Sequence, residues 1–183
     1  MEDELIKFPE LTQVLTDYAT YIREQYKSNL VSNGHKVTGK LYSSVQTNVV
    51  IGETQFAVDM SLAHYYKWVE DGRPKGGRPP INKILEWIQI KPVLPTGEKY
   101  ENLPTEKAQL SLAFAIAKSI EDHGYYNMNG LPVEPSHDLA LATEQTNANF
   151  MNRIEEALTN DLGRMGSKLI SLVIGDNNVD PVL

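Results

Sequence analysis

The chain has 183 residues and no cysteine, with 41% hydrophobic and 22% charged residues. This composition predicts one soluble globular domain, and it excludes disulfides, thiolate metal sites and cysteine nucleophiles. The net charge of −7 argues against free binding to nucleic acid by the protein as a whole, because phosphates are repelled.

Neither a leader nor a membrane span is expected. The first four residues are acidic at three positions, where a signal peptide needs positive charge. The apolar run at residues 169–174 is too short to span a bilayer. We therefore expect a soluble cytoplasmic protein without a membrane partner.

The first sixty residues predict a long helix followed by a β-hairpin. Apolar residues recur at helical steps over residues 8–30. A turn and a short element follow at residues 37–45. Residues 46–51 and 54–60 are rich in β-branched residues and are separated by Gly52-Glu53, which is a hairpin signal.

The next part of the chain predicts short helices joined by loops. A helix at residues 63–71 leads into a Pro/Gly-rich loop at 72–80, and a second helix follows at 81–90. Residues 91–103 have the composition of a loop. Thr105 is expected to cap a helix through about residue 122. The apolar residues of that helix predict that it is well buried: Leu110, Leu112, Ala113, Phe114, Ile116, Ala117 and Ile120.

A loop at residues 124–137 precedes a last long helical region at 139–174, and residues 175–183 are expected to fray. The predicted fold class is α+β. A small antiparallel sheet packs against long N-terminal and C-terminal helices, with a helical and loop insertion. No internal repeat divides the chain, so we expect a single domain over residues 1–183.

The loop at residues 72–80 has the character of a docking surface. It carries Arg73, Lys75 and Arg78 with no acidic residue and no nucleophile. Glu70 or Asp71, at the end of the preceding helix, is a candidate anchor for Arg73 or Arg78, in the same chain or a neighbouring one. Contact is therefore the expected role of this loop.

Charge is distributed unevenly along the chain. Residues 61–91 hold six Lys/Arg against three Asp/Glu, whereas residues 137–183 hold three against seven. A basic edge on an acidic body suits head-to-tail association between copies, or a partner of opposite sign. The alternative is that these segments form solvated surfaces whose charges differ by chance.

The segment from Gly34 to Lys40 matches the glycines and lysine of a phosphate-binding loop. Leu41 stands where that loop needs a hydroxyl for Mg²⁺, and a predicted helix precedes the segment where a strand is needed. The four histidines are scattered without metal-ligand spacing, and Ser43-Ser44 lacks a nucleophile-elbow context. We expect no catalytic residue, cofactor or metal.

Two motifs, taken in order, resemble the neck or tail-completion proteins of tailed bacteriophages, the head–tail joining minor structural proteins of siphophages. The first runs from Thr38 to Val45 and is similar to T-G-x-L-x-x-S-[IV], which follows the N-terminal helix of that family. The second runs from His64 to Gly72 and is similar to Y-x-x-[YFW]-[VL]-E-x-G, followed by a loop and Arg-Pro at 78–79.

The resemblance covers about residues 8–90 and the final helix. Pro80 departs from it, because an aromatic residue is usual there. Residues 91–137 exceed the compact family pattern, so they read as an insertion in a neck- or tail-completion-like domain.

The resemblance implies a non-enzymatic virion structural protein at the head–tail connector, present in the host cytoplasm during assembly. It implies a homo-oligomeric ring, six- or twelve-fold, which joins portal, adaptor or head-completion proteins to tail proteins. Double-stranded DNA passes through its lumen without specific binding. The residues expected at subunit or partner interfaces are Thr38, Gly39, Lys40, Tyr66, Trp68, Glu70, Gly72, Arg73, Lys75 and Arg78.

Two other functions stay open at this point. One is a small nucleotide- or phosphate-binding enzyme that uses the Gly34–Lys40 loop. The other is a nucleic-acid-binding module that uses the basic loop at 72–80, with steeply salt-dependent affinity for DNA.

Overall fold

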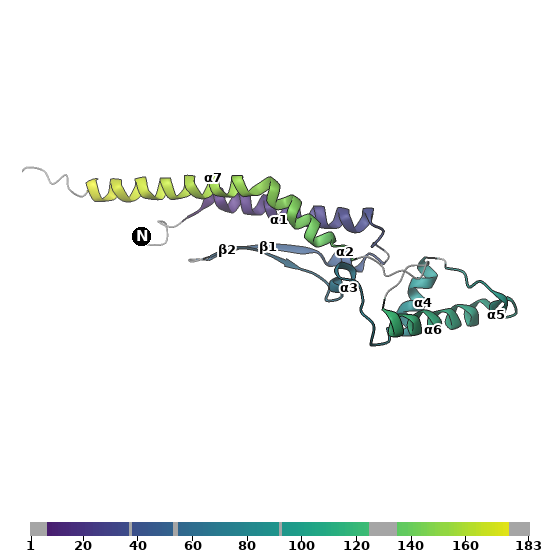
Figure 1. Cartoon of the computed structure of the whole chain (residues 1–183). Coiled ribbons are helices and arrows are strands. Elements are labelled where there is room, and N and C mark those ends of the chain that lie inside the picture. Colours follow the sequence, from purple (N-terminus) through teal and green to yellow (C-terminus); the bar gives the residue numbers. More distant parts are fainter. Residues whose placement is uncertain (1–6, 37, 53–54, 92, 125–134, 176–183) are drawn as a thin grey trace, which may run out of the picture. The chain divides into compact units, whose positions relative to one another are not determined.

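The computed structural model describes residues 7–36, 38–52, 55–91, 93–124 and 135–175 (Figure 1). These residues form helices and a two-stranded sheet. In chain order the elements are α1 (Pro9–Ser32), α2 (Lys40–Ser44), β1 (Gln46–Ile51), β2 (Phe56–Ser61), α3 (Tyr66–Glu70), α4 (Ile81–Ile90), α5 (Glu98–Glu101), α6 (Thr105–His123) and α7 (Asp138–Gly175).

The chain divides into two compact units, each built from separate stretches of sequence. Unit 1 contains Met1–Gln25, Gln46–Met60 and Ala142–Leu183, and unit 2 contains Tyr26–Val45 and Ser61–Leu141. Helices α1 and α7 each contribute to both units. The described residues of the predicted insertion (91, 93–124 and 135–137) belong to unit 2.

Unit 1 is a sheet of two antiparallel strands packed against the long helices α1 and α7 (Figure 1), which confirms the predicted α+β class. Apolar side chains at helical spacing on α1 and α7 face the hairpin, because burial of one face of each element stabilises both. The buried centre of this core is Leu11, Leu15 and Ala157, and the strands contribute Val49, Phe56 and Val58.

A buried carboxylate from α7 lies at the amino end of α1. Asp161 is 1% exposed, and its Oδ2 accepts a hydrogen bond from the backbone N–H of Leu11 at 2.8 Å. The first N–H groups of a helix have no partner within the helix, so a carboxylate there satisfies them and favours the helix dipole. Arg164, one turn along α7, forms an ion pair with Asp161 and balances its charge.

In unit 2, α4 packs against α6 (Figure 1). The prediction that α6 is well buried is correct for one side of the helix only. Ala113 and Ala117 are fully buried, but Leu110 and Phe114 are 43% and 50% exposed. Helix α4 covers one side of α6, and Leu110 and Phe114 lie on the side that remains open to solvent.

Three local predictions are corrected by the structure. The stretch at 91–103, expected to be a loop, contains the short helix α5. Helix α3 begins at Tyr66, three residues after the predicted start. Thr105 is the first residue of α6 and makes no side-chain capping hydrogen bond, since Pro104 occupies the cap position.

Candidate interface site

The basic loop at residues 72–80 joins α3 to α4 and has a defined shape. The Arg73 guanidinium lies 4.7 Å from the centre of the Trp68 ring, a cation–π contact with the preceding helix. Its Nη2 also donates to the backbone carbonyl of Gly77 at 3.0 Å. Arg73 therefore connects α3 to the middle of the loop.

The loop is also bound to the carboxyl end of α6. The backbone N–H of Gly76 donates to the Glu121 carbonyl at 2.9 Å. Carbonyls in the last turn of a helix lack partners within the helix, so this bond satisfies one of them. The Arg78 Nη2 and Nε donate to Glu121 Oε2 at 2.7 and 3.0 Å, and this pairing lowers the pKa of Glu121.

Gly124, at the end of α6, makes the closest backbone approach to the loop. Its φ and ψ are 87° and −163°, a region that only glycine adopts readily. A Cβ built at this position lies 2.8 Å from the carbonyl oxygen of Arg73. The turn after α6 therefore requires glycine for both its conformation and its contact.

These contacts leave several side chains of the loop and of α3 on the surface. Lys75 is exposed, and its ammonium has no partner among the residues that the structure describes. The side chain of Arg78 is 46% exposed, and Trp68 is 50% exposed. The loop and the end of α3 thus present cationic groups beside an aromatic ring, on a backbone held in place.

Glu70, a candidate anchor for the loop arginines, has a different partner in this chain. It is 6% exposed, and its Oε1 accepts a hydrogen bond from the backbone N–H of Leu139 at 2.9 Å. The carbonyl of Glu70 also accepts from the N–H of His137 at 3.4 Å. Glu70 therefore caps the amino end of α7, while Arg78 pairs with Glu121.

Asp138, the first residue of α7, is held by the end of α1. It is fully buried, and its Oδ1 accepts from Asn33 Nδ2 at 2.5 Å. Its Oδ2 lies 2.7 Å from His35 Nδ1, and its carbonyl accepts from Asn29 Nδ2 at 3.0 Å. Every polar group of Asp138 that faces α1 is thus satisfied.

Tyr26 lies beside these two carboxyl groups. It is fully buried, and within the described part of the chain its hydroxyl has no hydrogen bond of acceptable geometry. Burial raises the pKa of Tyr26, and the charges of Glu70 and Asp138 add to the rise. Burial likewise raises the pKa of Glu70, which Asp138 increases further and the Leu139 N–H partly offsets.

The segment at residues 38–44 forms the turn into α2. Gly39 has φ 74°, and the N–H of Lys40 donates to Thr38 Oγ1 at 3.3 Å. The ammonium of Lys40 lies 3.4 Å from Glu86 Oε1 on α4. The segment follows α1 directly, so the strand that a phosphate-binding loop requires does not precede it.

The two sequence motifs meet in unit 2. The Ser44 Oγ, from the first motif, accepts a hydrogen bond from the N–H of Ala63 at 2.9 Å and donates to the carbonyl of Leu41. Ala63 immediately precedes His64, where the second motif begins. Leu41 and Val45 of the first motif are buried, so several of its side chains serve the packing of this unit.

All ten residues predicted at interfaces lie in unit 2, with different exposure. Thr38, Lys40, Trp68, Lys75 and Arg78 are exposed; Gly39, Tyr66, Gly72 and Arg73 are half-buried; Glu70 is buried. Sequence reasoning missed three residues that shape this region: Glu121, Gly124 and Asp138. Gly124, just past the predicted end of the helix, was an available signal for a turn that needs glycine.

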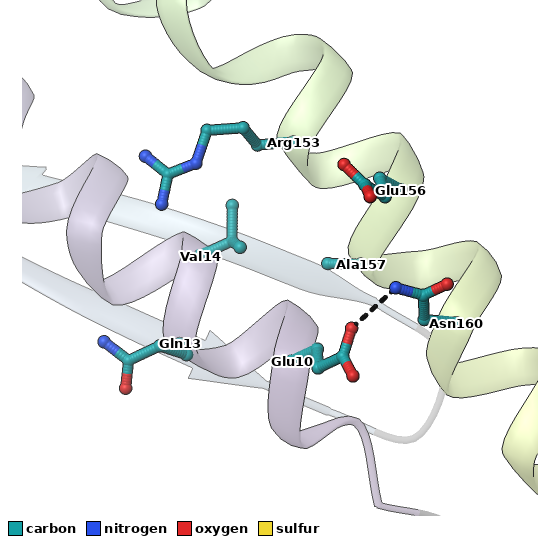
Figure 2. A pocket seen from close by; sticks show the side chains of 7 residues that line it. All are labelled: Glu10, Gln13, Val14, Arg153, Glu156, Ala157 and Asn160. Carbon is teal, nitrogen blue, oxygen red and sulfur yellow. Dashed lines mark hydrogen bonds between the residues drawn. The ribbon is translucent and has the colours of Figure 1, made fainter.

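A shallow pocket of about 240 Å³ lies in unit 1 between α1 and α7 (Figure 2). Asn160 Nδ2 donates to Glu10 Oε2 at 2.8 Å across one end of it. At the other end, Arg153 is already bound to Asp17 at 2.9 Å. The polar groups at both ends of the pocket are thus bound to other residues of this chain.

Among the described residues, no group of three or more His, Asp or Glu side chains is placed to hold a metal ion. No helix in this part of the chain is both long and apolar enough to cross a membrane. Comparison of the chain with models of protein families, with curated proteins and with solved structures finds no match.

Replacing Gly124 by Ala should lower the free energy of unfolding by about 1–3 kcal/mol, because the Cβ meets the Arg73 carbonyl and the backbone conformation is strained. Urea denaturation measures this loss. Gly77→Ala is the matched control, since nothing lies within 4 Å of a Cβ there, and it should change stability by less than about 0.5 kcal/mol. Equal losses of stability in the two variants would contradict the close approach of Gly124 to the Arg73 carbonyl.

Glu70→Ala should lower the free energy of unfolding by about 1–3 kcal/mol, because it removes the acceptor for the Leu139 N–H. Glu70→Gln keeps an acceptor oxygen and removes the charge. In the native protein the raised pKa means that the folded state holds the Glu70 proton more tightly than the unfolded state does. The Glu70 contribution to unfolding free energy therefore falls as pH rises from 4.5 through the raised pKa.

Glu70→Gln should abolish that part of the pH dependence, which urea denaturation between about pH 4.5 and pH 7 detects. The lowered pKa values of Glu86, Glu121 and Asp122 make the free energy of unfolding rise with pH, and they do so below pH 4.5. They are common to the native protein and the Glu70→Gln variant, so they cancel in the comparison. Identical slopes for native protein and Glu70→Gln above pH 4.5 would refute this assignment.

Proposed function

We propose that this chain is a non-enzymatic structural subunit of the head–tail connector of a tailed bacteriophage. In this proposal copies of the chain form a ring that joins the portal, adaptor or head-completion proteins to the tail. The ring surrounds the channel through which double-stranded DNA passes. The protein resides in the virion after assembly in the host cytoplasm.

The observation that carries the proposal is the meeting of the two motifs in unit 2. Ser44 of the first motif binds the backbone beside the second, and Glu70 of the second fixes the start of α7. The motifs that resemble the phage family thereby contribute to the unit from which the basic loop projects. The contact between the two motifs supports the resemblance to the phage family, and this support does not depend on any single residue match.

The composition of the loop surface supports contact with another protein. Tryptophan and arginine are enriched at the energetic centres of interfaces, and Trp68, Arg73 and Arg78 lie in or next to one short loop. Their positions are fixed before binding by the Trp68 ring, Gly77 and Glu121, so binding loses less conformational entropy. The net charge of −7 disfavours adhesion of DNA to the assembled ring.

Deleting the coding gene from the phage that carries it should yield DNA-filled heads and separate tails. Supplying the native protein in the host should restore infective particles. The variant Arg73→Ala/Lys75→Ala/Arg78→Ala should restore them about tenfold less well or worse, which corresponds to ~1.4 kcal/mol of lost contact energy. Plaque titre and electron microscopy of the lysate measure both effects.

A triple alanine variant at Lys7, Lys91 and Lys168 is the control. These lysines are exposed, so the variant removes the same charge from other surfaces. It should restore titre as the native protein does. Normal joining of heads and tails without the gene would overturn the proposed function. If both triple variants restored infective particles equally well, the basic loop would have no part in the proposed function.

A further inference from the structure

Helix α6 carries an exposed face on which two lysines flank two large apolar residues. Lys107, Leu110, Phe114 and Lys118 follow one another at steps of three and four residues, so they lie on one side of the helix. Leu110 is 43% exposed, Phe114 is 50% exposed and the Lys118 side chain is 57% exposed. Within the described residues Lys107 has no ion pair.

Helix α7 carries an exposed face with the opposite charge, in unit 1. Glu144, Ala148, Met151 and Glu155 follow the same steps of three and four residues. Met151 is 48% exposed, and both glutamates are exposed without an ion pair in the described part of the chain. The buried side of this helix is a different one, marked by Phe150.

The two faces match in both spacing and charge. Lys107 and Lys118 are eleven residues apart, and so are Glu144 and Glu155. At 1.5 Å per residue each pair spans about 16 Å. When the helices lie alongside each other, in either direction, both lysines therefore meet glutamates.

The apolar residues occupy the middle of the same contact. Leu110 and Phe114 then face Met151 and Ala148, so apolar surface is removed from water between two charge pairs. Lys118 already pairs with Asp122 at 2.7 Å and with Glu121 at 3.6 Å, but exposed pairs of this kind contribute little and do not hold the lysine.

We propose that the α6 face of one copy of this chain binds the α7 face of the next copy. The proposal rests on the proposed function, for which it supplies the contact between ring subunits. Because the two faces differ, the contact is heterologous, and its repetition closes into a ring when the rotation allows. The contact is about three turns long and is weak by itself, but in a closed ring every copy makes two such contacts.

Reversing the charges on one face tests the contact in the full-length protein. Lys107→Glu/Lys118→Glu and Glu144→Lys/Glu155→Lys should each weaken self-association by about tenfold or more, because like charges then face each other. Sedimentation velocity and light scattering over a concentration series measure this. Mixing the two variants should restore association, since each reversed face finds a complementary face on the other variant.

Restoration on mixing separates a contact between copies from misfolding or from a contact within one chain, neither of which mixing repairs. Glu156→Lys makes the charge change of Glu155→Lys at the next residue, on another side of α7, and it should associate like the native protein. A native protein that stays monomeric, or charge reversals without effect or without rescue, would overturn this inference. Loss of head–tail joining after gene deletion would still support the proposed function in that case.

Discussion

A buried carboxylate from a distant part of the sequence lies at the amino end of each long helix, and the rest of the structure depends on these two caps. Asp161 accepts the N–H of Leu11 in unit 1, and Glu70 accepts the N–H of Leu139 in unit 2. The free N–H groups and positive dipole end of a helix favour a carboxylate at this position, although at Glu70 burial outweighs them and raises its pKa. Because each cap closes a contact across more than sixty residues of sequence, the start of each helix is coupled to tertiary packing.

The caps show how a sequence motif can shape a surface without itself being exposed. Glu70 is directed inward, and the loop that follows it is directed by Arg73, Gly76 and Arg78 onto Trp68 and the end of α6. The motif therefore specifies the shape of the loop, while Lys75 and the exposed parts of Trp68 and Arg78 remain for a partner. This division fits an assembly protein, in which a rigid scaffold presents a small charged surface.

Much of the fold could be predicted from sequence because hydrophobic periodicity is a local signal. The long helices, the hairpin and the helix at Ile81–Ile90 followed from it. The caps could not be predicted, since Glu70 and Asp161 look like ordinary surface acids until remote N–H groups approach them. The exposure of Leu110 and Phe114 was missed for a related reason: periodicity identifies apolar positions on a helix but not how many neighbours cover them. For the site, composition located the loop, whereas its partners Glu121 and Gly124 come from a helix more than forty residues later.

The proposed function makes this chain a component of the virion that acts by contact. Quantitative mass spectrometry of purified, infective particles tests it most directly, with the portal protein as the internal standard. The account predicts that the chain is present at several copies per particle in a fixed ratio to the portal, unchanged by washing in high salt. Absence of the chain from purified particles, with the protein found only in the lysed cells, would contradict it.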